Sequence, residues 1–187
     1  MNQILNWHKQ LLLFLNNLGS PFFDSFWMII THRFFNIFIY LLLLIYFGYL
    51  KSWKNSIYLL FITCLLVLFT DQITNLFKTG IGRVRPCYDI EIQQFVRLVK
   101  PTCGGLYSFF SGHASNSFAL AVFFGSIFKF HKLFFISLIF IASMVSYSRI
   151  YIGVHYPLDI LFGSIFGILS GIVFSLLWNK IQIKRSN

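Results

Sequence analysis

Charged residues are scarce in this sequence of 187 residues. They form 11% of it and only five are acidic, whereas soluble domains have about 25% charged residues. Hydrophobic residues make up 57%, including 25 phenylalanines, and the mean hydropathy is +0.74. This composition argues against a soluble domain, a disordered chain and collagen-like repeats. It indicates an integral membrane protein of one compact domain.

Two further patterns are missing. The 15 basic residues give a net charge of +10, but they are scattered between apolar blocks and make no continuous basic face, so a nucleic-acid partner is not expected. Alternation of polar and apolar residues with a period of two is also absent, which favours a helical bundle over a transmembrane barrel.

Five apolar blocks approach the roughly 20 residues that span a bilayer. They are residues 34–50, 55–77, 113–130, 132–150 and 158–179. The first 32 residues predict an interfacial helix near 3–18 and a short or partly inserted helix near 22–31, which could add a sixth span. We predict an all-α, polytopic transmembrane helical bundle of five to six spans, divided into an N-terminal region 1–32, a bundle 33–180 and a basic cytoplasmic tail 181–187.

Basic residues suggest the orientation. One side of the predicted bundle receives short acid-free loops and the tail, with Lys51, Lys54, Lys129, Lys132, Lys180, Lys184 and Arg185. The positive-inside rule makes this side cytoplasmic. The other side, with the 79–112 connection and the 151–157 turn, then faces away from the cytoplasm. There a disulfide between Cys87 and Cys103 would be permitted, and two free thiols are the alternative.

Ionisable residues cluster at three places at the ends of predicted spans, all on this outer side. Such groups are costly near hydrocarbon and usually carry function. The topology brings them to one membrane face: Lys78, Arg85, His113, Arg149, His155 and Asp159. This convergence is the most informative feature of the sequence.

Three cations, two histidines and one acid suit phosphate chemistry. Lysine and paired arginines would neutralise a phosphate, and the Ser111-Gly112 step would open a helix whose free N–H groups bind anions. Asp159, four residues after His155, could hold one imidazole nitrogen and leave the other free to attack phosphorus. His113 could protonate the leaving oxygen. This chemistry needs no metal or other cofactor.

The remaining polar residues receive structural interpretations. Asp71, inside a span, is expected to form an ion pair or to support a cation of the site. Four others are expected to face water or headgroups: Arg83, Arg97, Lys100 and His131.

At these residues the sequence resembles the type 2 phosphatidic acid phosphatase family of membrane lipid phosphatases. The family signature has three parts, K-x6-RP, PSGH and SR-x5-H-x3-D. The chain matches them with Lys78 to Arg85-Pro86, then Phe110-Ser111-Gly112-His113, and then Ser148-Arg149, His155 and Asp159. Phe110 replaces the usual proline, from which we expect an altered loop shape and retained activity.

The resemblance implies a role for each matching residue. Lys78, Arg85 and Arg149 would hold the phosphoryl oxygens, helped by Ser111 and the backbone N–H groups of Gly112 and His113. His155 would form a phosphohistidine, Asp159 would orient it, and His113 would act as general acid before water releases phosphate.

The resemblance also suggests a substrate dissolved in the bilayer and a location in the bacterial inner membrane, with the site facing the periplasm. Undecaprenyl diphosphate ranks first as the substrate. Glycan transfer leaves its diphosphate on the outer side of the membrane, which the predicted site also faces. Phosphatidylglycerophosphate, phosphatidic acid and lipid A are alternatives. A lipid phosphotransferase and a non-catalytic membrane protein are alternatives from other classes. The sequence gives no indication of oligomeric state.

Overall fold

The computed structural model describes residues 2–128 and 132–186, and the side chains of 7–128 and 132–182. Lys129 and His131 lie outside the described residues, as do the side chains of Lys184 and Arg185. The helices are α1 (Asn2–Asn17), α2 (Pro21–Ile30), α3 (Arg33–Leu50), α4 (Trp53–Ile81), α5 (Gly112–Phe128), α6 (Lys132–Tyr151) and α7 (Pro157–Ser186), with the short 3-10 helices η1 (Pro86–Tyr88) and η2 (Gln93–Phe95) between α4 and α5.

The predicted all-α membrane bundle is confirmed. Each predicted apolar block coincides with one helix from α3 to α7, and the two N-terminal helices also lie where the sequence placed them. No strand occurs in the part of the chain that the structure describes, where Val84 and Tyr107 form an isolated antiparallel bridge. Helix α7 continues past residue 180, so the predicted tail begins within a helix.

Within the described residues, four helices are long and apolar enough to cross a membrane, namely α3, α4, α6 and the Pro157–Gln182 part of α7. Large apolar side chains on these helices remain exposed in the isolated chain, for example Phe38 at 61%, Ile57 at 67% and Leu176 at 63%. Surfaces of this kind are stable in lipid and not in water. The structure therefore agrees with membrane embedding.

Helix α5 is the centre of the bundle, and most of its residues are buried. Its backbone packs closely on α7 because Gly163, Gly167 and Gly171 present no side chain there. A Cβ atom at Gly163 would lie 2.6 Å from the carbonyl oxygen of Ser111. Small residues four apart allow helix backbones to approach in membranes, since interhelical attraction there comes from close packing. This contact sets the position of the first residues of α5.

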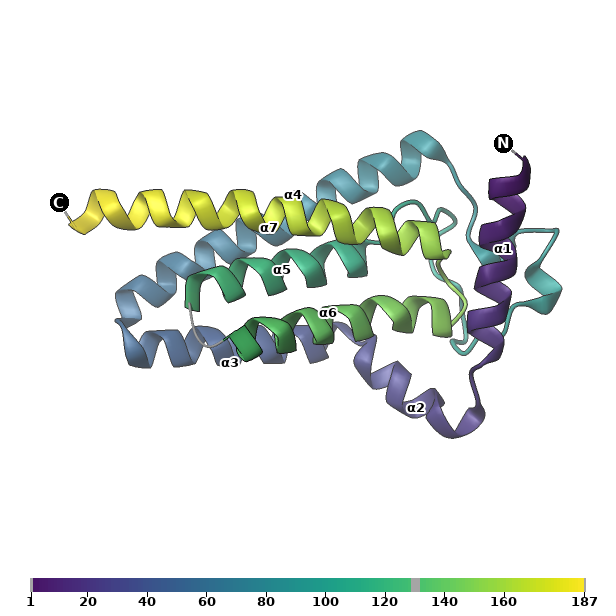
Figure 1. Cartoon of the computed structure of the whole chain (residues 1–187), viewed down its shortest axis with the longest axis horizontal. Coiled ribbons are helices and arrows are strands. Elements are labelled where there is room, and N and C mark those ends of the chain that lie inside the picture. Colours follow the sequence, from purple (N-terminus) through teal and green to yellow (C-terminus); the bar gives the residue numbers. More distant parts are fainter. Residues whose placement is uncertain (1, 129–131, 187) are drawn as a thin grey trace.

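Helix α1 lies across one end of the bundle (Figure 1). The Asn16 amide fixes it there by donating hydrogen bonds to the carbonyl oxygens of Ile150 and Tyr151 at 3.1 and 2.7 Å. Its Oδ1 accepts a hydrogen bond from the backbone N–H of Arg97 at 2.7 Å. These contacts tie α1 to the end of α6 and to the 82–111 connection.

The structure corrects the prediction that Arg97 faces water or headgroups. Its Nη2 donates to both carboxylate oxygens of Asp24 on α2, each at 2.6 Å. The guanidinium carbon also lies 5.6 Å from the centre of the Tyr151 ring. The sequence separation of 73 residues hid this pairing, which fixes α2 to the connection.

Candidate functional site

Several helix ends meet beside α1, where α4 ends and α5 and α7 begin (Figure 1). Helix α4 stops because Gly82 adopts a left-handed conformation, with φ of 65°. The chain then runs extended through the Val84–Tyr107 bridge. Pro157 occupies the first turn of α7, where its missing N–H costs no hydrogen bond. These local signals direct polar residues from distant segments toward one place.

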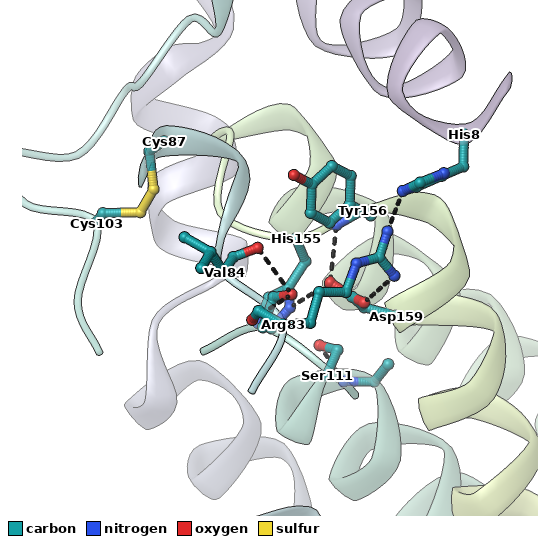
Figure 2. Close-up of polar contacts among 11 residues, drawn as sticks. His8, Arg83, Val84, Cys87, Cys103, Ser111, His155, Tyr156 and Asp159 are labelled. Atoms are coloured by element: carbon teal, nitrogen blue, oxygen red, sulfur yellow. Dashed lines mark hydrogen bonds and ion pairs between the residues drawn. A yellow bond between two sulfur atoms is a disulfide. The ribbon is translucent and has the colours of Figure 1, made fainter. Parts of the chain in front are cut away.

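His155 and Asp159 form the centre of the site (Figure 2). The His155 Nδ1 lies 3.3 Å from Asp159 Oδ2, and the same oxygen accepts the backbone N–H of Tyr156 at 3.0 Å. The predicted contact is thus present. Burial, and next the positive charges of Arg85 and Arg149, hold the pKa of the His155 imidazole well below its usual value of 6.5. The ring is therefore neutral at pH 7, as a nitrogen nucleophile must be.

Ser111 precedes α5 and is fully buried against α7. Its backbone N–H donates to the carbonyl oxygen of Asp159 at 3.0 Å, and its Oγ accepts the N–H of Ala114 at 3.4 Å. The residue thus caps α5 and links it to α7. The N–H groups of Gly112 and His113 belong to the first turn of α5, where a helix has free donors.

Lys78, Arg85 and Arg149 supply positive charge beside this pair. Lys78 interacts electrostatically with both arginines and with Asp159, and its Nζ would lie 3.9 Å from a Cβ atom on Gly112. Arg85 and Arg149 are only 9% and 5% exposed. Among the described residues none of the three forms a salt bridge, and the Nε atoms of both arginines are buried without a hydrogen-bond partner.

His113, at the start of α5, is within electrostatic range of Arg149, His155 and Lys78. The structure therefore brings together the eight residues that the sequence predicted for the site. They are Lys78, Arg85, Ser111, Gly112, His113, Arg149, His155 and Asp159.

Asp71 forms no ion pair with any residue that the structure describes, although an ion pair was one of two predictions for it. Its Oδ1 accepts a hydrogen bond from the Asn116 amide at 2.8 Å, and its charge acts on Lys78. The second prediction, support for a cation of the site, agrees with this arrangement.

Arg83 is the clearest correction at the site. The sequence placed it in water or headgroups, but its Nη1 donates to Asp159 Oδ1 at 3.0 Å. The signal for it was the spacing: residues i and i+2 of an extended segment share a face, so Arg83 accompanies Arg85 toward the site. Only the extended conformation, set by the bridge at Val84 to Tyr107, reveals this.

Sequence reasoning also missed Thr31, which lies in the turn between α2 and α3. Its Oγ1 accepts a hydrogen bond from Arg149 Nη1 at 2.5 Å. No local signal connects residues 118 positions apart. Lys100 was likewise expected in water or headgroups, but it is partly buried within the electrostatic range of Arg149 and Arg85.

The 82–111 connection is packed around the site. Cys87 and Cys103, bonded or free in the sequence interpretation, form a disulfide in the structure with Cα atoms 6.3 Å apart (Figure 2). Phe110, in place of the usual proline, is buried between Phe77 and Phe166, with ring centres 5.3 and 5.2 Å away. These contacts hold the segment that leads into Ser111.

The arrangement combines a buried neutral imidazole, a carboxylate that orients it and three cations without carboxylate partners among the described residues. A dianionic group would satisfy these cations and would lie beside the imidazole. Among the described residues there is no cluster of three His, Cys, Asp or Glu side chains that could hold a metal ion. The geometry suits transfer of a phosphoryl group to nitrogen.

Comparisons with known proteins agree with this geometry. The sequence model of the PAP2 superfamily matches residues 55–183. The lipid A 4'-phosphatase of Porphyromonas gingivalis is 33% identical over 91% of this chain and 72% of its own length. The corresponding protein of Bacteroides thetaiotaomicron is 34% identical over 94% and 78%. A transmembrane PAP2-type phosphatidylglycerolphosphate phosphatase from Bacillus subtilis shares the fold, with a TM-score of 0.78 at 20% identity over 97% of this chain and 89% of that chain.

Proposed function

Because this chain belongs to the PAP2 superfamily and is a membrane lipid phosphatase, we propose that it removes a phosphate from a lipid A-type glycolipid through a phosphohistidine on His155. The observation that carries the proposal is the set of buried cations beside this imidazole. Arg85 and Arg149 expose 9% and 5% of their surface and have no salt bridge among the described residues. Buried charges are stable only when they are paired, so a phosphate is the natural partner.

In the first step, the free nitrogen of His155 attacks phosphorus while Asp159 holds the other nitrogen. An N–P bond forms and the bond from phosphorus to the lipid oxygen breaks. His113 donates a proton to that oxygen. Lys78, Arg85 and Arg149 neutralise the charge on the three phosphoryl oxygens, helped by Ser111 and the N–H groups at the start of α5.

In the second step, a water molecule attacks the phosphohistidine and gives a proton to His113. The N–P bond breaks, inorganic phosphate leaves and His155 becomes neutral again. A lipid phosphotransferase would use a second acceptor instead of water. Transfer that depends on an added acceptor and exceeds hydrolysis would identify that activity.

The relatives change the order of candidate substrates. Undecaprenyl diphosphate ranked first from the sequence, but the curated relatives above are lipid A phosphatases, which favours a phosphorylated disaccharide lipid. The lipid A 4'-phosphatases are named for the phosphate position on which they act. We propose that this chain removes the phosphate at the same position.

We propose that the site faces the periplasm across the inner membrane. The lysines at the opposite end of the bundle carry this proposal. Lys51 follows α3, Lys54 lies in the first turn of α4 and Lys132 begins α6, which puts all three at the end remote from the site. Positive residues of short loops stay on the cytoplasmic side.

A substrate panel tests the proposed function. Purified protein in detergent is given lipid A, undecaprenyl diphosphate, phosphatidylglycerophosphate and phosphatidic acid in the presence of EDTA. We expect the highest kcat/KM with lipid A, loss of the 4'-phosphate, and inhibition by vanadate, which mimics phosphate. Preference for another lipid would overturn the substrate. Activity that depends entirely on added divalent metal would contradict the histidine mechanism.

A further inference from the structure

Arg83 takes one oxygen of the Asp159 carboxylate. Its Nη1 donates to Oδ1 at 3.0 Å, whereas Oδ2 accepts His155 Nδ1 and the N–H of Tyr156 (Figure 2). The carboxylate is completely buried and the Arg83 side chain is 20% exposed. Because each carboxylate oxygen accepts hydrogen bonds from different donors, the carboxylate has a single favourable rotation about its Cβ–Cγ bond.

Arg83 is itself held by helix α1. Its second nitrogen, Nη2, contacts Nε2 of His8, a fully buried residue of α1. The guanidinium carbon lies 4.1 Å from the centre of the Tyr156 ring, and the His8 ring lies 4.9 Å from the same ring. The guanidinium is thus fixed by a carboxylate, an aromatic ring and an imidazole.

Lys9, the residue after His8 on α1, supports the hydroxyl end of Tyr156 through Asp89. Lys9 Nζ lies 2.8 Å from Asp89 Oδ2, and the Tyr156 hydroxyl donates to the same oxygen at 2.7 Å. Tyr156 directly follows His155 in the chain. Two consecutive residues of α1 therefore support the segment that carries the proposed nucleophile, although α1 lies outside the matched residues 55–183.

We propose that Arg83 is a positioning residue, fixed by His8 of α1, which holds the Asp159 carboxylate so that His155 keeps its free nitrogen toward the phosphate. The inference rests on the proposed roles of His155 and Asp159. A carboxylate that accepts Nδ1–H determines which nitrogen of the imidazole carries the proton. At metal sites, removing the partner that orients a ligating histidine costs ten- to hundredfold in affinity or activity, and we expect a loss of the same size for a partner of this carboxylate.

The chain provides a matched control in Arg97. This arginine also pairs with a carboxylate, that of the partly exposed Asp24, and also lies over a tyrosine ring, that of Tyr151. It lies in the same connection between α4 and α5. Its partner belongs to α2, and in the described part of the chain neither of the two forms a hydrogen bond or ion pair with His155 or Asp159, so the pair reproduces the structural role without the positioning role.

The test compares Arg83→Gln, Arg83→Lys, His8→Gln and Arg97→Gln with the unaltered protein. The substrate is whichever lipid phosphate of the panel the unaltered protein hydrolyses. We expect Arg83→Gln to lower kcat ten- to hundredfold with KM changed less than about threefold. Arg83→Lys should recover part of kcat, His8→Gln should show a smaller loss, and Arg97→Gln should keep kcat while lowering the melting temperature.

A second readout needs no substrate. The ring ¹⁵N chemical shifts of His155 report which nitrogen carries the proton, and we expect one tautomer in the unaltered protein and a mixture in Arg83→Gln. Retention of the single tautomer and of kcat in a folded Arg83→Gln protein would overturn the inference. A rise of KM with kcat intact would overturn it too, since that result assigns Arg83 to substrate binding. If the unaltered protein hydrolyses no lipid phosphate, the proposed function fails, and the tautomer still decides the role of Arg83.

Discussion

Two arginine side chains of the site are buried and keep guanidinium donors free to bind a phosphate. Arg149, near the end of α6, is buried and donates one hydrogen bond to Thr31, while its Nε is buried without a partner among the described residues. Phosphate oxygens would accept hydrogen bonds from the remaining guanidinium donors. The donors of a guanidinium form a planar fork that matches two oxygens. The same reasoning applies to Arg85, whose Nε is also buried and unpartnered.

Arg149→Lys tests this fork geometry. Lysine keeps the charge, but its ammonium is a compact point charge without the planar fork, so it cannot form the paired hydrogen bonds of a guanidinium to two phosphate oxygens. We expect kcat/KM to fall about 100-fold, comparable to the loss of one donor to a transition-state oxygen. Lys54→Arg, at the opposite end of the bundle, is the control and should keep its activity. A near-normal kcat/KM for Arg149→Lys would remove this residue from phosphate binding.

The pH dependence follows from the environment of His155. Burial and the charges of Arg85 and Arg149 lower the pKa of its imidazole well below 6.5, so acidification inactivates the nucleophile only below that pH. We expect its ring ¹⁵N shifts to stay constant between pH 8 and 6.5, whereas a histidine peptide in the same buffer is half protonated near 6.5. In Arg85→Gln, loss of a nearby cation should move the His155 titration toward higher pH. A His155 that titrates like the peptide would show that the site is open to water.

That these ionisable residues come together at one end of the bundle could be predicted from the sequence, for a physical reason. Ionisable groups at span ends are costly, so Lys78, Arg149 and His155 are conspicuous in a sequence of low charge. Arg83 and Thr31 were missed because their roles depend on contacts with residues 76 and 118 positions away. Such partners are set by the tertiary structure, and local patterns give no information about them.

At the scale of helices, the packing of α5 on α7 sets the geometry of the site. Ser111 and the first turn of α5 lie against Gly163, and the next two glycines of the row lie against Ser115 and Ala119. Hydropathy predicts each of these helices, since long apolar blocks have few alternatives in a membrane. The 82–111 connection, by contrast, is irregular, and the sequence indicated its length, its cysteines and the motif residues at its two ends, but not its conformation.

Gly167→Ala tests the importance of this packing. The added Cβ would collide with the backbone carbonyl of Ser115, and a backbone atom cannot move aside as a flexible side chain can. We expect a loss of about 1–3 kcal/mol in stability and reduced activity, because α5 and its N–H groups would shift. Thermal unfolding in detergent measures the effect. Gly80→Ala on α4 is the control, because beyond the neighbouring backbone of its own helix no described atom lies within 4 Å of its added Cβ. Equal melting temperatures for both variants would contradict the packing argument.

At the scale of the whole molecule, the bundle separates two chemical functions. Its long helices α3, α4, α6 and α7 expose apolar side chains suited to lipid, and one end gathers the charges that suit a headgroup. Helix α1 covers that end and is tied to it by Asn16 and His8. This separation explains how a chain with 11% charged residues can hold a highly charged site.

Orientation in the membrane is the prediction that belongs to this scale. The test uses a protein in which Cys64, Cys87 and Cys103 are replaced by serine. A single cysteine introduced for Lys51 in this protein should react with a membrane-impermeant thiol reagent only after the membrane is opened. A cysteine for Ile90, which is 85% exposed in the connection near the site, should react in intact spheroplasts. The reverse pattern would place the site in the cytoplasm.

The most direct test of the account is to identify the residue that receives the phosphoryl group. The protein is mixed with ³²P-labelled lipid substrate, quenched in alkali within milliseconds, digested and mapped, since phosphohistidine survives alkali and is lost in acid. We predict label on the peptide that contains His155, absent from His155→Ala. Label on another residue, or full turnover by His155→Ala, would contradict the account.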